Sequence, residues 1–125
     1  MKELDTIKEI IGVLPDMPMI MLHTMDSKPD RMVGLFSYDA SLQQTFGDAS
    51  GYGDTIETPR IQIRVRDLTD PEAEKLIRAI EEKLSAYDDG SALFVWVSGI
   101  LPLGRDGHNP PRWEYTVNYE VALSD

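Results

Sequence analysis

At 125 residues the chain has the length expected of a single domain, residues 1–125, and its apolar fraction of 42% is sufficient for a hydrophobic core. The formal net charge is -10, which argues against nucleic-acid binding, because that binding draws its affinity from lysine and arginine contacts to phosphate. The chain contains no cysteine, which excludes disulfides, thiolate zinc sites and cysteine nucleophiles.

The N-terminal residues lack the charged and then apolar layout of a signal peptide. No apolar run approaches the ~20 residues of a membrane span. We therefore expect a soluble protein made in the cytoplasm.

The N-terminal third predicts one helix and two strands. Apolar residues recur at helical spacing over residues 3–14, and Pro15 ends this helix. Residues 19–24 and 32–38 are rich in strand-forming residues, and the turn residues 26–30 separate them. We therefore expect two strands after the helix.

Residues 39–59 form a long polar segment that offers little to a core. A loop of about this length inside a domain is usually functional or disordered. The stretch from Gly47 to Asp54 places acidic residues where a phosphate-binding loop requires hydrogen-bond donors. We interpret the segment as a mobile polar loop and not as a cofactor site.

The stretch from residue 59 to residue 87 is the most informative part of the chain. Apolar and polar residues alternate over residues 60–66, which predicts a strand with one buried and one solvent-exposed face. Asp70 and Pro71 then mark a helix start, with Asp70 as the cap and Pro71 in the first turn. An apolar stripe continues to Tyr87 and predicts an amphipathic helix.

The C-terminal third predicts two further strands. The near-continuous apolar run at residues 93–97 indicates a strand buried on both faces, and residues 102–111 indicate a loop. Strict alternation over residues 113–123 predicts the last strand.

Two of the predicted strands carry polar faces of opposite character. One presents Arg60, Gln62, Arg64 and Arg66, and the other presents Glu114, Thr116, Asn118 and Glu120. If the strands pair antiparallel, each cross-strand contact would contribute roughly 0.2–1 kcal/mol. One interpretation is a solvated outer sheet face, and the other is a surface that meets a neighbouring subunit.

The sequence contains no known catalytic or metal-binding motif. His23 and His108 lack the spacing of metal ligands, and no Gly-x-Ser-x-Gly elbow is present around Ser98 or any other serine. No carboxylate stands out as one held in an apolar site for acid catalysis. We therefore predict neither an enzyme nor a protein with a cofactor or a bound metal.

From Leu14 to Leu123 the chain resembles the minor capsid or tail terminator proteins of long-tailed bacteriophages. Four segments carry the resemblance: Pro-Arg-Ile-Gln-Ile-Arg-Val-Arg at 59–66, Ile-Glu-Glu-Lys-Leu at 80–84, Leu-Pro-Leu-Gly-Arg-Asp at 101–106, and Arg-Trp-Glu-Tyr-Thr-Val-Asn-Tyr-Glu-Val at 112–121. The Gly-Arg-Asp turn followed by the last of these segments is the most specific feature.

The resemblance implies an α+β fold, with a mainly antiparallel sheet of four to five strands and two helices packed on one face. It implies a virion structural protein of the tail or neck, assembled in the host cytoplasm, that forms a ring, with a hexamer expected. The ring would cap the tail tube and join it to the head-side connector, and DNA would pass through it. Candidate interface residues are Arg60, Gln62, Arg64, Arg66, Asp48, Tyr52, Asp54, Glu114 and Glu120.

Two other functions remain open at this point. One is a small ligand-binding or regulatory α+β module whose apolar pocket is lined by Met17, Met19, Met21, Trp96 and Trp113. Methionine and tryptophan also commonly fill protein cores, which is the simpler interpretation of these residues. The other is a hydrolase that uses buried carboxylates.

Overall fold

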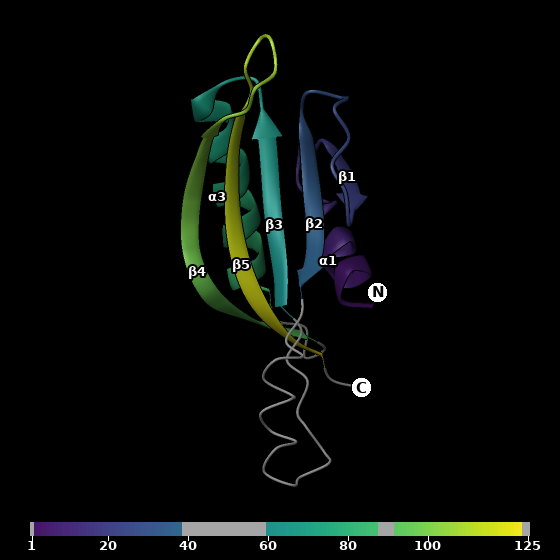
Figure 1. Cartoon of the computed structure of the whole chain (residues 1–125). Helices are drawn as coiled ribbons and strands as arrows, with labels where there is room; N and C mark the ends of the chain where they lie inside the picture. The colour runs from purple at the N-terminus through teal and green to yellow at the C-terminus, as the bar shows by residue number, and fades with distance from the viewer. Residues whose placement is uncertain (1, 39–59, 88–91, 124–125) are drawn as a thin grey trace, which may run out of the picture.

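A computed structural model describes residues 2–38, 60–87 and 92–123 (Figure 1). Its elements in chain order are α1 (Lys2–Ile11), β1 (Met19–Leu22), β2 (Met32–Tyr38), β3 (Arg60–Asp67), α3 (Asp70–Ser85), β4 (Ala92–Arg105) and β5 (Trp113–Leu123). The strands form a five-stranded sheet in the order β1-β2-β3-β5-β4. Only β1 and β2 pair in parallel, so the predicted α+β fold with a mainly antiparallel sheet is confirmed. The loop predicted at residues 39–59 lies outside the described residues.

Strand β3 occupies the centre of the sheet, between β2 and β5. The register places Ile63 beside Leu35 of β2 and Val117 of β5, and all three side chains are fully buried. Neighbours in register share one face of a sheet because side chains alternate along each strand. These residues form one hydrophobic cluster with the apolar side chains of α1 and α3. In Figure 1, α3 lies behind β3 and β5.

Helix α3 begins one residue earlier than the predicted cap implies. The N-cap is Thr69, whose hydroxyl accepts a hydrogen bond from the Glu72 backbone N–H at 3.3 Å, so the prediction of Asp70 as the cap is wrong. Pro71 lies in the first turn as predicted. The Asp70 carboxylate accepts a hydrogen bond from the Tyr115 hydroxyl, which fastens the start of α3 to β5.

Helix α3 ends at Ser85, two residues before the predicted Tyr87, and α1 and β1 also end earlier than predicted. Helix α1 ends at Ile11, and the Leu14 N–H donates to the Ile11 carbonyl at 3.0 Å in a tight turn that follows the helix. Strand β1 ends at Leu22 because His23 takes a left-handed backbone conformation with φ of 70°.

The prediction for β4 is wrong in both extent and burial. The strand runs for 14 residues, so the predicted loop begins only after Arg105. Pro102 is tolerated because β4 is the outer strand of the sheet, where a missing N–H disturbs no central ladder. Val95 and Val97 are 46% and 40% exposed, so this apolar run is not buried on both faces.

The core position of Ile63 generates a stability prediction. Ile63→Asp should abolish the cooperative unfolding transition, because an unpaired carboxylate at a fully buried site costs several kcal/mol, close to the whole stability of a small domain. Gln62→Asp, the matched control on the opposite face of β3, should unfold cooperatively like the wild type. Circular dichroism during urea titration measures both, and a cooperative Ile63→Asp variant of near wild-type stability would contradict the packing described above.

Candidate functional site

Strands β3 and β5 place the two predicted polar faces side by side. Arg60 pairs with Glu120, Gln62 with Asn118, Arg64 with Thr116 and Arg66 with Glu114. We refer to these side chains as the polar face of the sheet. The two strands do pair antiparallel, which was the condition for favourable contacts between their polar faces, and the arginine-bearing and glutamate-bearing strands form one surface of one subunit.

The lower end of the polar face carries an ordinary ion pair. Arg60 Nη2 lies 2.9 Å from Glu120 Oε1, and the two side chains are 27% and 29% exposed. Next to this pair, Asn118 Nδ2 donates to Ser98 Oγ of β4 at 3.1 Å. A partly exposed pair of this kind contributes up to about 1 kcal/mol.

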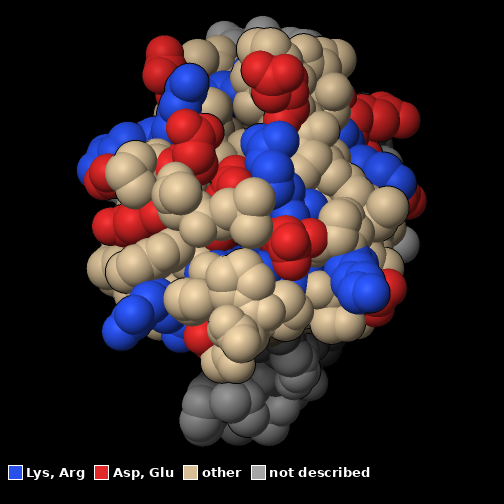
Figure 2. Space-filling view, turned by 90° about the horizontal axis from the view of Figure 1, so that it is seen from above, with Lys and Arg blue, Asp and Glu red and all other residues tan. Residues whose placement is uncertain are grey.

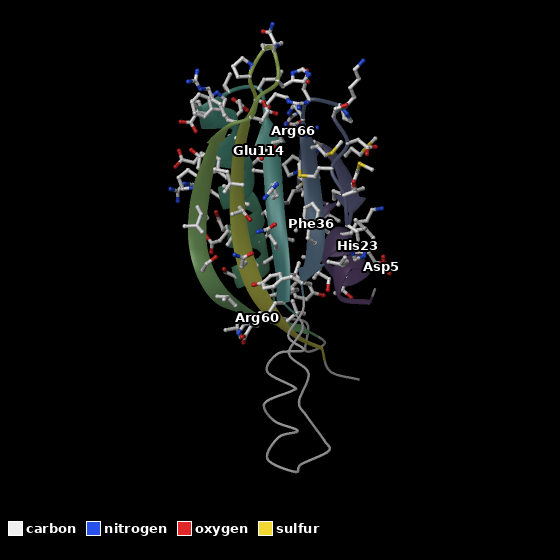
Figure 3. The ribbon with its side chains drawn as sticks, in the orientation of Figure 1. Asp5, His23, Phe36, Arg60, Arg66 and Glu114 are labelled. Atoms are coloured by element: carbon white, nitrogen blue, oxygen red, sulfur yellow. The ribbon has the colours of Figure 1, made fainter. Side chains whose placement is uncertain are left out.

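The upper end of the polar face is buried. Arg66 is 4% exposed, so the expectation of a solvent-exposed strand face is wrong at this position. Its guanidinium donates to the carbonyl oxygens of Asp26, Pro29 and Asp30 at 2.6–2.9 Å. Burial, and then the charge of Arg112, lower the pKa of Arg66 from its ordinary value. Arg66 thus holds the connection between β1 and β2 against the sheet; Figure 3 shows Arg66 and Arg60 at opposite ends of β3.

A second buried arginine, Arg112, completes this end of the molecule and was not singled out by the sequence analysis. It is 5% exposed, and its Nε donates to Asp106 Oδ2 at 2.7 Å. Its Nη1 donates to the Ser27 carbonyl and to Asp30 Oδ1. The sequence signal was the family-like segment that begins with Arg112, together with the preceding Gly-Arg-Asp turn, which contains Asp106.

Asp106 is the acceptor at the centre of this network. Burial favours a higher pKa, but the backbone and side-chain hydrogen bonds from Arg112 and the His108 N–H outweigh it, so the pKa of Asp106 lies below its ordinary value. Figure 2, which views this end from above, shows acidic and basic side chains interspersed without a large patch of one sign. The network closes the upper end of the sheet and does not form an obvious ligand site.

Arg64, at the centre of the polar face, has neither the ion pair of Arg60 nor the carbonyl partners of Arg66. It is half-buried, and its Nε, like that of Arg60, is shielded from solvent with no hydrogen-bond partner. Thr116, across the strand, directs its hydroxyl to the Ile63 carbonyl at 3.0 Å. Within residues 2–38, 60–87 and 92–123, no ion pair neutralises Arg64, so its charge is available to a partner.

The structure does not support the apolar pocket of methionine and tryptophan side chains that the sequence left open. A cavity of about 320 Å³ lies between the α1–β1 connection and α3, with Leu14, Met17 and Leu76 in its lining. Met17 is therefore at a cavity, whereas Met19 is 56% exposed on β1 and Trp113 packs against the core. The side chain of Trp96 lies outside the described residues.

The described part of the chain contains no group of three or more histidine, aspartate and glutamate side chains placed to hold a metal ion. No described helix is long and apolar enough to cross a membrane. Three interface candidates, Asp48, Tyr52 and Asp54, fall outside the described residues.

A family model of bacteriophage tail terminator proteins matches residues 9–125. The chain belongs to the bacteriophage tail terminator family. The match includes all five strands and α3, and it confirms the resemblance found in the sequence. Searches of curated proteins and of solved structures each gave no match. A tail terminator is a structural protein of the virion, located in its tail or neck, that interacts with other phage tail or head proteins.

Arg66 and Arg64 of the polar face should contribute differently to the stability of the protein. Arg66→Ala should lower the free energy of unfolding by about 2–4 kcal/mol, because it removes hydrogen bonds to three carbonyls at a buried site. Arg64→Ala should lower it by less than about 1 kcal/mol, because no intramolecular partner is lost. Urea unfolding of both variants provides the measurement, and equal losses would contradict the assignment.

The lowered pKa of Asp106 predicts an acid-sensitive contribution to stability. A carboxyl group with a lowered folded pKa stabilises the protein above its unfolded pKa of about 3.9 and loses that effect as the pH falls through the folded value. Asp106→Asn should therefore be less stable than the wild type at pH 7, and the difference should shrink below about pH 4. A difference that is the same at pH 3 and pH 7 would rule out this titration.

Proposed function

We propose that this tail terminator forms a ring of identical copies, six being the expected number, that caps the tail tube and joins it to the head-side connector. The family match over residues 9–125 is the observation that carries the proposal. Assembly would take place in the host cytoplasm before the ring is incorporated into the virion. The described residues contain no metal-binding cluster, which is compatible with a purely structural role.

We further propose that α1 and α3 cover one face of the sheet and leave the polar face for contacts with other proteins. The shared hydrophobic cluster of both helices with β2, β3 and β5 supports this arrangement. A ring requires head-to-tail contacts between two different patches of each subunit. On the polar face, Arg60 already has Glu120 and Arg66 has the β1–β2 connection, so Arg64 is the residue that would receive a carboxylate from a neighbour.

The net charge supports a role at the DNA passage. At -10 for each copy, a ring would surround its channel with negative potential, which repels phosphate and would let DNA pass without binding. Asp48, Tyr52 and Asp54 would take part in contacts with a neighbouring copy or with the tube.

Mass photometry of the pure protein, alone and with purified tail tubes, tests the ring directly. We expect one closed oligomer of fixed size, and tube growth that stops when the protein is added. A chain that stays monomeric with tubes present and leaves tube length unchanged would refute the proposed function.

Reversing the charge at Arg64 tests the proposed contact. Arg64→Glu should raise the concentration needed for assembly about tenfold or more, because it replaces an attraction across the contact with a repulsion. Its melting temperature should change little, because the described fold makes no ion pair with Arg64. Arg78→Glu is the charge-matched control on α3, where the side chain is 64% exposed, and it should assemble normally. A large fall in melting temperature with assembly intact would contradict the prediction.

A further inference from the structure

Both outer strands of the sheet present unpaired backbone groups. β1 and β4 are the terminal strands in the sheet order, and they form the two outer edges in Figure 1. Among the described residues, no backbone hydrogen bond from a turn or loop reaches the outer side of either strand. An uncovered edge is a template for pairing with a further strand, and proteins that stay monomeric usually block it with charges, prolines or bulges.

Strand β4 is blocked along its upper part only. Its register with β5 shifts between Trp96 and Ser98, between Ser98 and Leu101 and between Pro102 and Gly104, and such irregularities bend an edge strand. The lower part, Ala92–Trp96, pairs with β5 in regular register and has no such feature. The sequence contains no charged residue between Ala92 and Gly104, and Val95 is 46% exposed. This segment is therefore an unprotected apolar edge.

Strand β1 has a matching edge. The strand itself, Met19–Leu22, contains neither a charged residue nor a proline, and Met19 is 56% exposed. Met19 pairs with Met32, and Met32 pairs with Arg66 of the polar face. Val95 pairs with Glu120, which also belongs to the polar face. Met19 and Val95 therefore lie on the same side of the sheet. On the opposite side, Ile20 of β1 and Phe94 of β4 are both half-buried apolar residues beside the core. The two edges thus offer apolar side chains on both faces.

The strand directions also match. β1 is parallel to β2, and three successive antiparallel pairings lead from β2 through β3 and β5 to β4, so β4 runs opposite to β1. If the ring axis runs along the strands, rotation about it preserves the strand directions, and the β4 edge of one copy would then face the β1 edge of the next in antiparallel orientation. Antiparallel pairing is the more stable kind.

We propose that Ala92–Trp96 of each copy pairs antiparallel with β1 of the next copy, so that the sheets of neighbouring subunits join edge to edge. This proposal rests on the proposed ring and names the backbone contact that closes it. The occupant of the β4 edge is a second copy of this chain, because that copy supplies an uncharged strand of similar length and opposite direction. The contact is heterologous, since each copy contributes a different edge to each of its two neighbours.

A charge placed on the edge tests the contribution of β4. Val95→Lys should reduce assembly at least tenfold in mass photometry while the melting temperature stays within a few degrees, because a lysine on an edge strand opposes strand addition. Leu68→Lys is the matched control: Leu68 is 45% exposed in the turn before α3 and should assemble like the wild type. If the wild type forms rings and Val95→Lys forms them equally well, the edge proposal fails while the ring stands. If the wild type stays monomeric, both fail.

Cross-linking identifies the two edges. The chain has no cysteine, so single-cysteine variants report unique positions. A tagged Val95→Cys copy mixed with a Met19→Cys copy should give a cross-linked heterodimer with a short bis-maleimide, and replacing Met19→Cys by Leu68→Cys should remove the product. Equal cross-linking of the Leu68→Cys control, Val95→Cys homodimers as the main product, or a link from Val95→Cys only to the tube protein would each overturn the proposed pairing.

Discussion

The placement of β3 between two antiparallel partners is the constraint on which the rest of this fold depends. Its apolar side chains at 61, 63 and 65 are fully buried in the cluster that includes both helices. Because the side-chain period of a strand is two, this burial fixes Arg60, Gln62, Arg64 and Arg66 on the opposite face. A shift of one residue would exchange the faces and place charges in the core, so the register is strongly specified. Burial of the apolar face of β3 therefore determines which residues form the polar face.

Two buried arginines extend this constraint to the loops. Arg66 and Arg112 reach from β3 and the start of β5 into the β1–β2 connection, and most of their partners there are backbone carbonyls. A buried guanidinium without partners would be strongly destabilising, so the loop and the arginines hold each other in place. One consequence is that Arg66 is not available to another protein, although it lies on the same face as Arg64. The four polar residues of the alternating pattern in β3, Arg60, Gln62, Arg64 and Arg66, therefore differ in their surroundings.

The sequence predicted the parts of the fold that depend on local pattern. Alternation located β3 and β5 almost to the residue, and richness in strand-forming residues located β2; the alternating polar faces at 60–66 and 113–123 were also predicted to suit antiparallel pairing. The prediction failed for β4, because a continuous apolar run looks the same in a central strand and in an edge strand with partly exposed apolar side chains. It also failed for Arg66, because the loop that covers this side chain lies more than 30 residues away in the sequence. Alternation gives the face of a residue, and only the tertiary structure shows what lies above it.

Net charge places a further demand on any assembly of this protein. Copies that each carry -10 repel one another, and at physiological ionic strength the repulsion is strongest within a Debye length of about 8 Å. Contacts between copies are therefore favoured where acidic side chains are absent or balanced. The β1 and lower β4 edges lie in uncharged stretches, and Arg64 contributes a positive charge at the centre of the polar face. Strand pairing at such edges brings backbone groups together without bringing carboxylates together. For an acidic subunit with uncharged edges, electrostatic repulsion between copies is therefore weakest where those edges meet.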